Sequence, residues 1–145
     1  MDYETVSAPD FGRSLTGIGL NLLVRDVART AAALEAVFGM TVHRASADFA
    51  ILVSGHDVLQ LHSDQTYSQN ALLNLLPENP PRGAGVELRL YEVDPDEAVA
   101  RAHAHEGVTV LAEPENKPHG LREAIILDPD GYAWLPSRRL DPSED

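Results

Sequence analysis

Apolar and polar positions alternate over residues 18–24, which predicts a β-strand because successive side chains of a strand point to opposite faces. Apolar residues then recur at helical spacing from Val27 to Phe38, with Asp26 placed to cap the first turn and Gly39 to end the last. This helix is expected to be followed by three short strands, at residues 41–45, 47–53 and 58–62.

The same order of elements returns later in the chain. Residues 86–93 alternate as a strand, Asp94 is placed to cap a helix over residues 95–106, and Gly107 to end it. Asp26 precedes Gly39 by thirteen positions, as Asp94 precedes Gly107. Further strands are predicted at residues 108–111, 121–127 and 131–135. A βαβββ unit thus occurs twice, and two units this small are expected to pack together.

The sequence Asp128-Pro129-Asp130-Gly131 lies between two apolar runs and predicts a hairpin. Proline presets one turn angle and glycine takes a positive one. The flanking residues are rich in Ile, Leu, Tyr and Trp, which suits a half-buried sheet. Trp134 is expected to pack between sheet and helix, with stacking on a ligand as the alternative.

The remaining segments predict the domain organisation. Residues 64–84 combine a short helical pattern at 70–76 with three prolines, which indicates a linker between modules at 16–63 and 85–138. Residues 1–15 are polar and are expected to form a flexible N-terminal tail. Residues 139–145 are expected to form an acidic tail.

Composition narrows the classes of function. The 145 residues include 23 Asp and Glu against 11 Lys and Arg, a net charge of −12, so no basic surface for nucleic acid is expected. This negative net charge either only keeps the protein in solution or also attracts a cationic ligand. The absence of cysteine excludes thiolate chemistry. No apolar run is long enough to span a membrane and no signal peptide is recognisable, so a cytoplasmic location is expected.

Four segments carry a resemblance to a known family: LLVRDV (22–27), ALEAVFGM (33–40), GVELRLYEVD (85–94) and REAIILDPDGYAWL (122–135). They resemble the vicinal oxygen chelate superfamily, which includes glyoxalase I, extradiol dioxygenases, and fosfomycin- and bleomycin-resistance proteins. The resemblance implies an α+β fold in which two βαβββ modules form an eight-stranded cup around a ligand. It also implies that residues 16–138 form one domain and that the protein is a homodimer.

Metalloenzymes of this superfamily carry ligands on the first and last strands of each module. Those positions fall on Gly19, Gln60, Glu87 and Leu135, of which only Glu87 is a good ligand. His62 is an alternative if the register of its strand is shifted. His62 and Glu87 together fall short of the about three protein ligands of a catalytic site. We therefore expect no metal and no other cofactor.

The resemblance also implies which residues line the cup. These candidate ligand-binding residues are Asn21, Gln60, His62, Glu87, Arg89, Tyr91, His119 and Leu135. Structural alternatives remain for these residues: Glu87 and Arg89 as an exposed ion pair, Tyr91 as packing at the rim, Asn21 and Gln60 as mutual partners, and His62 without a role.

Three hypotheses for the function remain. The first is a metal-independent binding protein, similar to the bleomycin-resistance branch, that sequesters a small molecule such as an antibiotic or secondary metabolite. The second is a divalent-metal-dependent glyoxalase- or dioxygenase-like enzyme with a shifted site, or a metal-free variant with Glu87 or His62 as general base. The third is a protein whose cup has lost its ligand.

Overall fold

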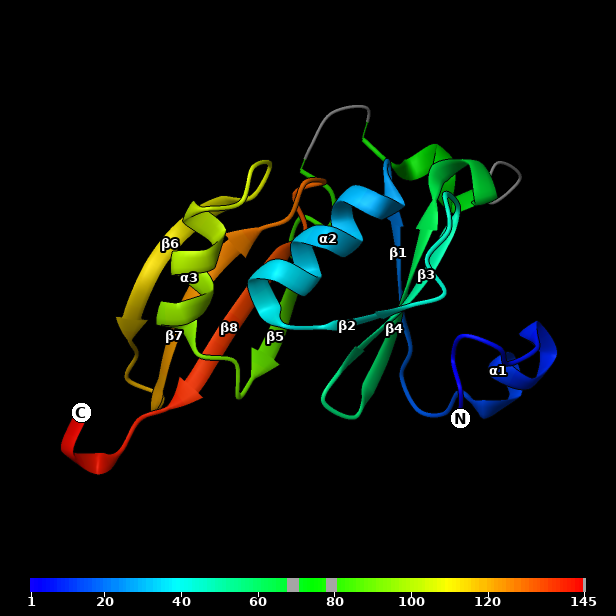
Figure 1. Ribbon diagram of the computed structural model, residues 1–145. Helices are drawn as coiled ribbons and strands as arrows, with labels where there is room; N and C mark the ends of the chain where they lie inside the picture. Colours follow the sequence, from blue (N-terminus) through cyan, green and yellow to red (C-terminus); the bar gives the residue numbers. More distant parts are fainter. Residues whose placement is uncertain (68–70, 78–80, 145) are drawn as a thin grey trace. The chain divides into compact units, whose positions relative to one another are not determined.

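The computed structural model describes residues 1–67, 71–77 and 81–144, which divide into two compact units. The first unit comprises Met1–Glu35 and Gly39–Leu75, and the second Ala36–Phe38 and Leu76–Asp145. Each unit contains one four-stranded sheet, which confirms the predicted α+β class (Figure 1). The division after Leu75 falls within the predicted linker. The other predicted domain bounds, and the joining of both sheets into one cup, stay predictions.

The first unit has the sheet order β1-β4-β3-β2, with β1 parallel to β4 and the other pairs antiparallel. Its elements are α1 (Ala8–Ser14), β1 (Leu20–Val24), α2 (Val27–Phe38), β2 (Thr41–His43), β3 (Phe49–Ser54), β4 (Asp57–Ser63), η1 (Asp64–Tyr67) and η2 (Ala71–Leu75). The last residues of α2 are grouped with the second unit.

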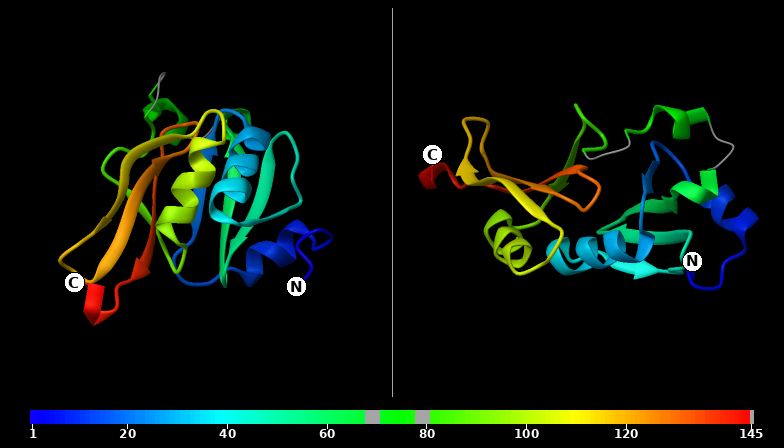
Figure 2. Two further views of the ribbon diagram at one scale, coloured as in Figure 1. Left: turned by 60° about the vertical axis from the view of Figure 1, so that its left-hand side comes forward. Right: turned by 90° about the horizontal axis from the view of Figure 1, so that it is seen from above.

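The second unit repeats this topology with the order β5-β8-β7-β6, and β5 is again parallel to β8. Its elements are β5 (Glu87–Tyr91), α3 (Pro95–His103), β6 (Thr109–Asn116), β7 (Leu121–Leu127), β8 (Ala133–Arg139) and η3 (Pro142–Glu144). Helix α3 packs on one face of β6, β7 and β8 (Figure 2). The duplicated βαβββ unit predicted from sequence is therefore present.

Three of the four predicted helix caps are present, at Asp26, Gly39 and Asp94. The Asp26 side chain accepts a hydrogen bond of 3.0 Å from the amide of Arg29, and Gly39 ends α2 with a φ of 72°. The Asp94 side chain caps α3 in the same way through the amides of Asp96 and Glu97. Gly107 does not end α3, because the helix stops at His103 and a turn separates the two.

Strand ends differ from the predicted ranges. Ile18 was expected in the first strand, but it is fully exposed and β1 begins at Leu20. Strand β6 reaches Asn116, well beyond the predicted residues 108–111, because register shifts allow its polar half to stay paired with β7. Apolar alternation could not show this extension, since the added residues are mostly polar or charged.

Residues 1–15, for which a flexible tail is predicted, contain local structure. The segment contains α1, which begins after Ser7, and the Ser7 side chain accepts a hydrogen bond from the amide of Asp10. Phe11 is buried, and its ring meets the ring of Phe49 on β3 edge to face at 6.5 Å between centroids. Figures 1 and 2 show α1 beside the first sheet, away from α2.

The predicted hairpin joins β7 to β8 and is closed by a bond from the Asp128 amide to the Tyr132 carbonyl. The Asp128 carboxylate accepts bonds from the amides of Asp130 and Tyr132 and from Nε1–H of Trp134 at 3.0 Å. Trp134 is almost fully buried on the same face of the sheet as its register partner Leu88, which supports its expected packing role.

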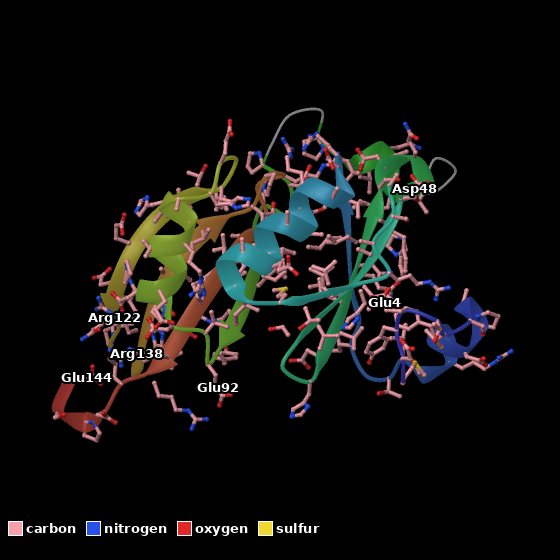
Figure 3. The ribbon with its side chains drawn as sticks, viewed as in Figure 1. Glu4, Asp48, Glu92, Arg122, Arg138 and Glu144 are labelled. Atoms are coloured by element: carbon pink, nitrogen blue, oxygen red, sulfur yellow. The ribbon has the colours of Figure 1, made fainter. Side chains whose placement is uncertain are left out.

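The linker and the acidic tail also contain local structure. The helical pattern expected at 70–76 is the 3-10 helix η2, although residue 70 lies outside the described residues. Near the C-terminus, η3 brings Glu144 to Arg138, with 2.9 Å between Oε2 and Nη2 (Figure 3). Within the described chain, no helix is both long and apolar enough to cross a membrane.

Candidate functional site

Polar side chains gather on one face of the second sheet, which we call the Arg89 face. On β5, Glu87, Arg89 and Tyr91 alternate with Leu88 and Leu90 and so share a face. Register partners across the sheet lie on the same face. The Arg89 face therefore includes Glu87, Arg89 and Tyr91 of β5, Ala133, Leu135 and Ser137 of β8, and Leu121, Glu123, Ile125 and Leu127 of β7.

An ion-pair network forms the centre of the Arg89 face. The Arg89 guanidinium contacts the Glu123 carboxylate through Nη2 and lies 3.5 Å from Glu87 through Nη1. The Glu123 side chain is 10% exposed, whereas the Glu87 side chain is 57% exposed. Burial disfavours the charged form of Arg89, but the two carboxylates outweigh this effect and raise its pKa above the ordinary value.

His119 joins this network from the turn that precedes β7. Its Nε2 lies 3.3 Å from Oε2 of Glu123, so Glu123 is shared between Arg89 and His119. Glu123 was missing from the predicted site. A signal was present in the sequence, because alternation in β7 places Glu123 opposite the buried residues Ala124 and Ile126.

The other predicted residues of the Arg89 face differ in accessibility. Tyr91 is exposed, and its ring centroid lies 6.0 Å from Cζ of Arg89, within reach of a cation–π contact. Leu135, the register partner of Arg89 on β8, is almost fully buried. Its side chain therefore packs against other residues of the protein and is not exposed on the Arg89 face. Ser137 is also buried, and its Oγ has no hydrogen bond among the described residues.

The corresponding face of the first sheet, the Gln60 face, comprises Asn21 and Leu23 of β1, Val58, Gln60 and His62 of β4, Phe49 and Ile51 of β3, and His43 of β2. Asn21 is the register partner of Gln60, as the predicted alternation requires. The Gln60 side-chain oxygen lies 3.2 Å from Nε2 of His62. Burial lowers the pKa of His62, which favours the neutral imidazole.

The side chains at the family's metal-ligand positions do not fit a metal site. Gln60 is hydrogen-bonded to His62, Glu87 is paired with Arg89, and Leu135 is an apolar side chain. Gly19 has no side chain to offer. Over the described ranges, no three His, Cys, Asp or Glu side chains are grouped to hold a metal ion. His62 lies in the first unit and Glu87 in the second.

Two four-stranded sheets, each built by a βαβββ unit, define the α+β class to which this fold belongs. The family model of the Glyoxalase/Bleomycin resistance protein/Dioxygenase superfamily matches residues 18–135, and the chain belongs to this superfamily. No curated protein was found to match the chain.

Solved structures agree with this fold. A glyoxalase/bleomycin resistance protein/dioxygenase family enzyme from Burkholderia phytofirmans PsJN is 23% identical, with a TM-score of 0.70 over 83% of this chain and 96% of that chain. Lactoylglutathione lyase from Agrobacterium tumefaciens is also 23% identical, with a TM-score of 0.61 over 85% and 92%. TioX from Micromonospora sp. ML1 is 20% identical, with a TM-score of 0.60 over 87% and 98%. Likeness at this identity shows the fold alone.

Proposed function

We propose that this protein is a metal-independent small-molecule-binding protein of the glyoxalase/bleomycin-resistance type, and that it sequesters a cationic ligand such as an antibiotic or secondary metabolite. The observation that carries the proposal is the Arg89–Glu123–Glu87 network, in which the family's one competent metal-ligand residue is paired with a guanidinium. A catalytic metal site needs about three protein ligands, and Glu87, which already shares its carboxylate with Arg89, is the one competent ligand among the four positions.

The charge of the Arg89 face favours a cationic ligand. Glu87 and Glu123 together carry two negative charges, whereas Arg89 carries one positive charge. Glu87 is also the more exposed of the two carboxylates, so its free side is open to a second cation. Tyr91 lies on the same face at the opposite end of β5, and its exposed ring offers a second surface, for cation–π contact. The overall net charge of −12 would attract such a ligand over longer distances.

Elemental analysis with a thermal-shift screen tests the proposal. We expect no stoichiometric transition metal in the purified protein. We expect aromatic amines to raise the melting temperature, and their N-acetylated analogues and aromatic carboxylates to leave it unchanged. A ligand that binds the native state at one hundred times its Kd adds about 2.7 kcal/mol of stability. The protein is also expected to be a homodimer, which light scattering can measure on the same sample.

Matched variants locate the binding site. Glu87→Gln should weaken binding of the amine about tenfold or more, because it removes a charge-assisted contact. Glu106→Gln makes the same change of net charge at an exposed position outside the Arg89 face, and it should leave the affinity within about twofold. One tightly held metal per chain, lost in Glu87→Ala together with a chelator-sensitive activity, would establish the alternative metalloenzyme. No response to any compound would favour a cup without a ligand.

A further inference from the structure

The N-terminal segment, residues 1–15, contacts the Gln60 face through a chain of rings. Tyr3 meets Phe11 edge to face at 6.1 Å between centroids, Phe11 meets Phe49 at 6.5 Å, and Phe49 meets His62 at 5.1 Å. Tyr3 also lies 5.4 Å from the ring of His43. Because Phe49 and His62 are register partners, these rings lie on the face that carries Gln60.

A polar contact fixes the same segment. Both carboxylate oxygens of Glu4 accept from the backbone amide of Arg44, at 3.0 and 3.1 Å, and Nδ1 of His43 lies 3.3 Å from one of them. The Arg44 guanidinium donates to the carbonyl of Val6. Arg44 has a φ of 49°, a left-handed conformation that is uncommon for a residue other than glycine. Figure 3 labels Glu4 between α1 and the first sheet.

The attachment is nevertheless light. Phe11 is the one buried residue among positions 1–15, and the Glu4 side chain is 56% exposed. Few buried contacts imply that the segment can open locally without unfolding of the sheet beneath it. The groups that the segment contacts, which are the Phe49 ring and the Arg44 backbone amide, would then become available to another molecule.

We propose that the N-terminal segment is an exchangeable internal ligand of the Gln60 face, and that the external ligand which replaces it carries an aromatic ring and a hydrogen-bond acceptor. The ring would take the place of Phe11 against Phe49, and the acceptor would take the place of the Glu4 carboxylate at the Arg44 amide. This inference goes beyond the proposed function and rests on different residues, since none of them belongs to the Arg89 face.

Native-state hydrogen exchange of the full chain tests the opening directly. The Arg44 amide should exchange through local opening, at a rate at least tenfold above that of Leu52, a buried residue of β3. Glu4→Ala should accelerate Arg44 exchange at least tenfold further and leave Leu52 unchanged. Glu35→Ala, which removes an exposed carboxylate from α2, should alter neither. Equal exchange of Arg44 and Leu52 in the unmodified protein would overturn the proposal.

Two dyes that share a ring system test the class of ligand. The Glu4→Ala/Phe11→Ala variant should bind 8-anilinonaphthalene-1-sulfonate at least tenfold more tightly than the unmodified protein. N-phenyl-1-naphthylamine lacks the sulfonate acceptor, so its affinity should increase less.

Competition by peptides tests whether the segment and the dye share a site. A peptide of residues 1–15 should displace the sulfonate dye, and a peptide with Glu4→Ala and Phe11→Ala should not. Failure of the first peptide to compete would overturn the proposal. Glu87→Gln should leave every result unchanged, so this outcome is separate from that of the proposed function.

Discussion

The two sheets share one topology but expose different chemistry at equivalent positions. The Gln60 face meets a ring-bearing segment of its own chain, and its polar residues include the Gln60 amide and the His62 imidazole, whose pKa is lowered by burial. The Arg89 face is a network of charges shared by Glu87, Arg89 and Glu123. A duplicated backbone therefore sets where side chains lie, while the residues at those places decide what each face can bind.

The largest effect is expected where the turns of the two units differ. A Cβ on Gly131 would lie 2.5 Å from Cα of Pro81, and Gly131 has a φ of 90°. Gly55, in the turn of the first unit, also has a positive φ, but a Cβ there meets only open space. Gly131→Ala should cost about 3 kcal/mol of unfolding free energy, and Gly55→Ala about 1 kcal/mol. Urea unfolding measures both, and equal losses would contradict the close packing of Pro81.

The second prediction concerns the ion pairs that distinguish the Arg89 face. Arg89→Met should cost about 2 kcal/mol, because it leaves the nearly buried Glu123 with His119 as its remaining ion-pair partner in the described chain. Adding Glu123→Leu to this variant should recover most of the loss, since replacing a buried pair by apolar residues is often neutral. Urea unfolding of the two single variants and the double variant gives the coupling energy. Additive losses would show that the contact is not a coupled pair.

The third prediction uses the buried carboxyl of the hairpin in the second unit. Burial raises the pKa of Asp128 to about 6, although bonds from Trp134 and two backbone amides oppose the shift. The folded protein then binds this proton more tightly than the unfolded chain. The carboxyl therefore contributes more stability near pH 4 and loses that contribution as pH rises through about 6.

Asp128→Asn removes this titration and keeps one acceptor oxygen, which can serve either the two backbone amides or Trp134. The unfolding free energy of the variant, relative to the unmodified protein, should improve by on the order of 2 kcal/mol between pH 4.5 and pH 7.5. Urea titrations at both pH values measure the difference. A constant offset between the two proteins would show that Asp128 does not titrate in this range.

Particular residues show how far the sequence could predict the structure. The caps at Asp26 and Asp94 and the hairpin at residues 128–131 were predictable, because each rests on neighbouring residues. Helix α1 was missed although Ser7, with Asp10 three positions later, is a local start signal. The contact between Glu4 and Arg44 was not predictable, since it joins residues forty positions apart through an unusual backbone angle.

The same limit applies to the candidate site. Alternation was sufficient to group Glu87, Arg89 and Tyr91, because one strand carries all three. It could not show that Arg89 takes Glu123 as its closer partner, since the pairing of β7 with β8 and of β8 with β5 depends on the tertiary fold. The alternation of a strand predicts which residues share a face, whereas predicting which of them are in contact requires the register between strands.

The smallest effect is expected from a comparison of the two chain ends. The C-terminal turn is held by the ion pair of Glu144 with Arg138, which lowers the pKa of Glu144 to about 2. The N-terminal segment is held by the rings of Tyr3 and Phe11 as well as by the Glu4 carboxylate. Salt screens exposed charges much more than apolar contacts. In 1 M NaCl, the NMR titration of Glu144 should therefore shift towards its ordinary value, while ring signals of Phe11 stay unchanged.

Arg138→Gln should shift the Glu144 titration in the same direction with little change in the melting temperature, because an exposed pair contributes little to stability. A Phe11 signal that moved together with Glu144 would show that the two ends are held by the same kind of force.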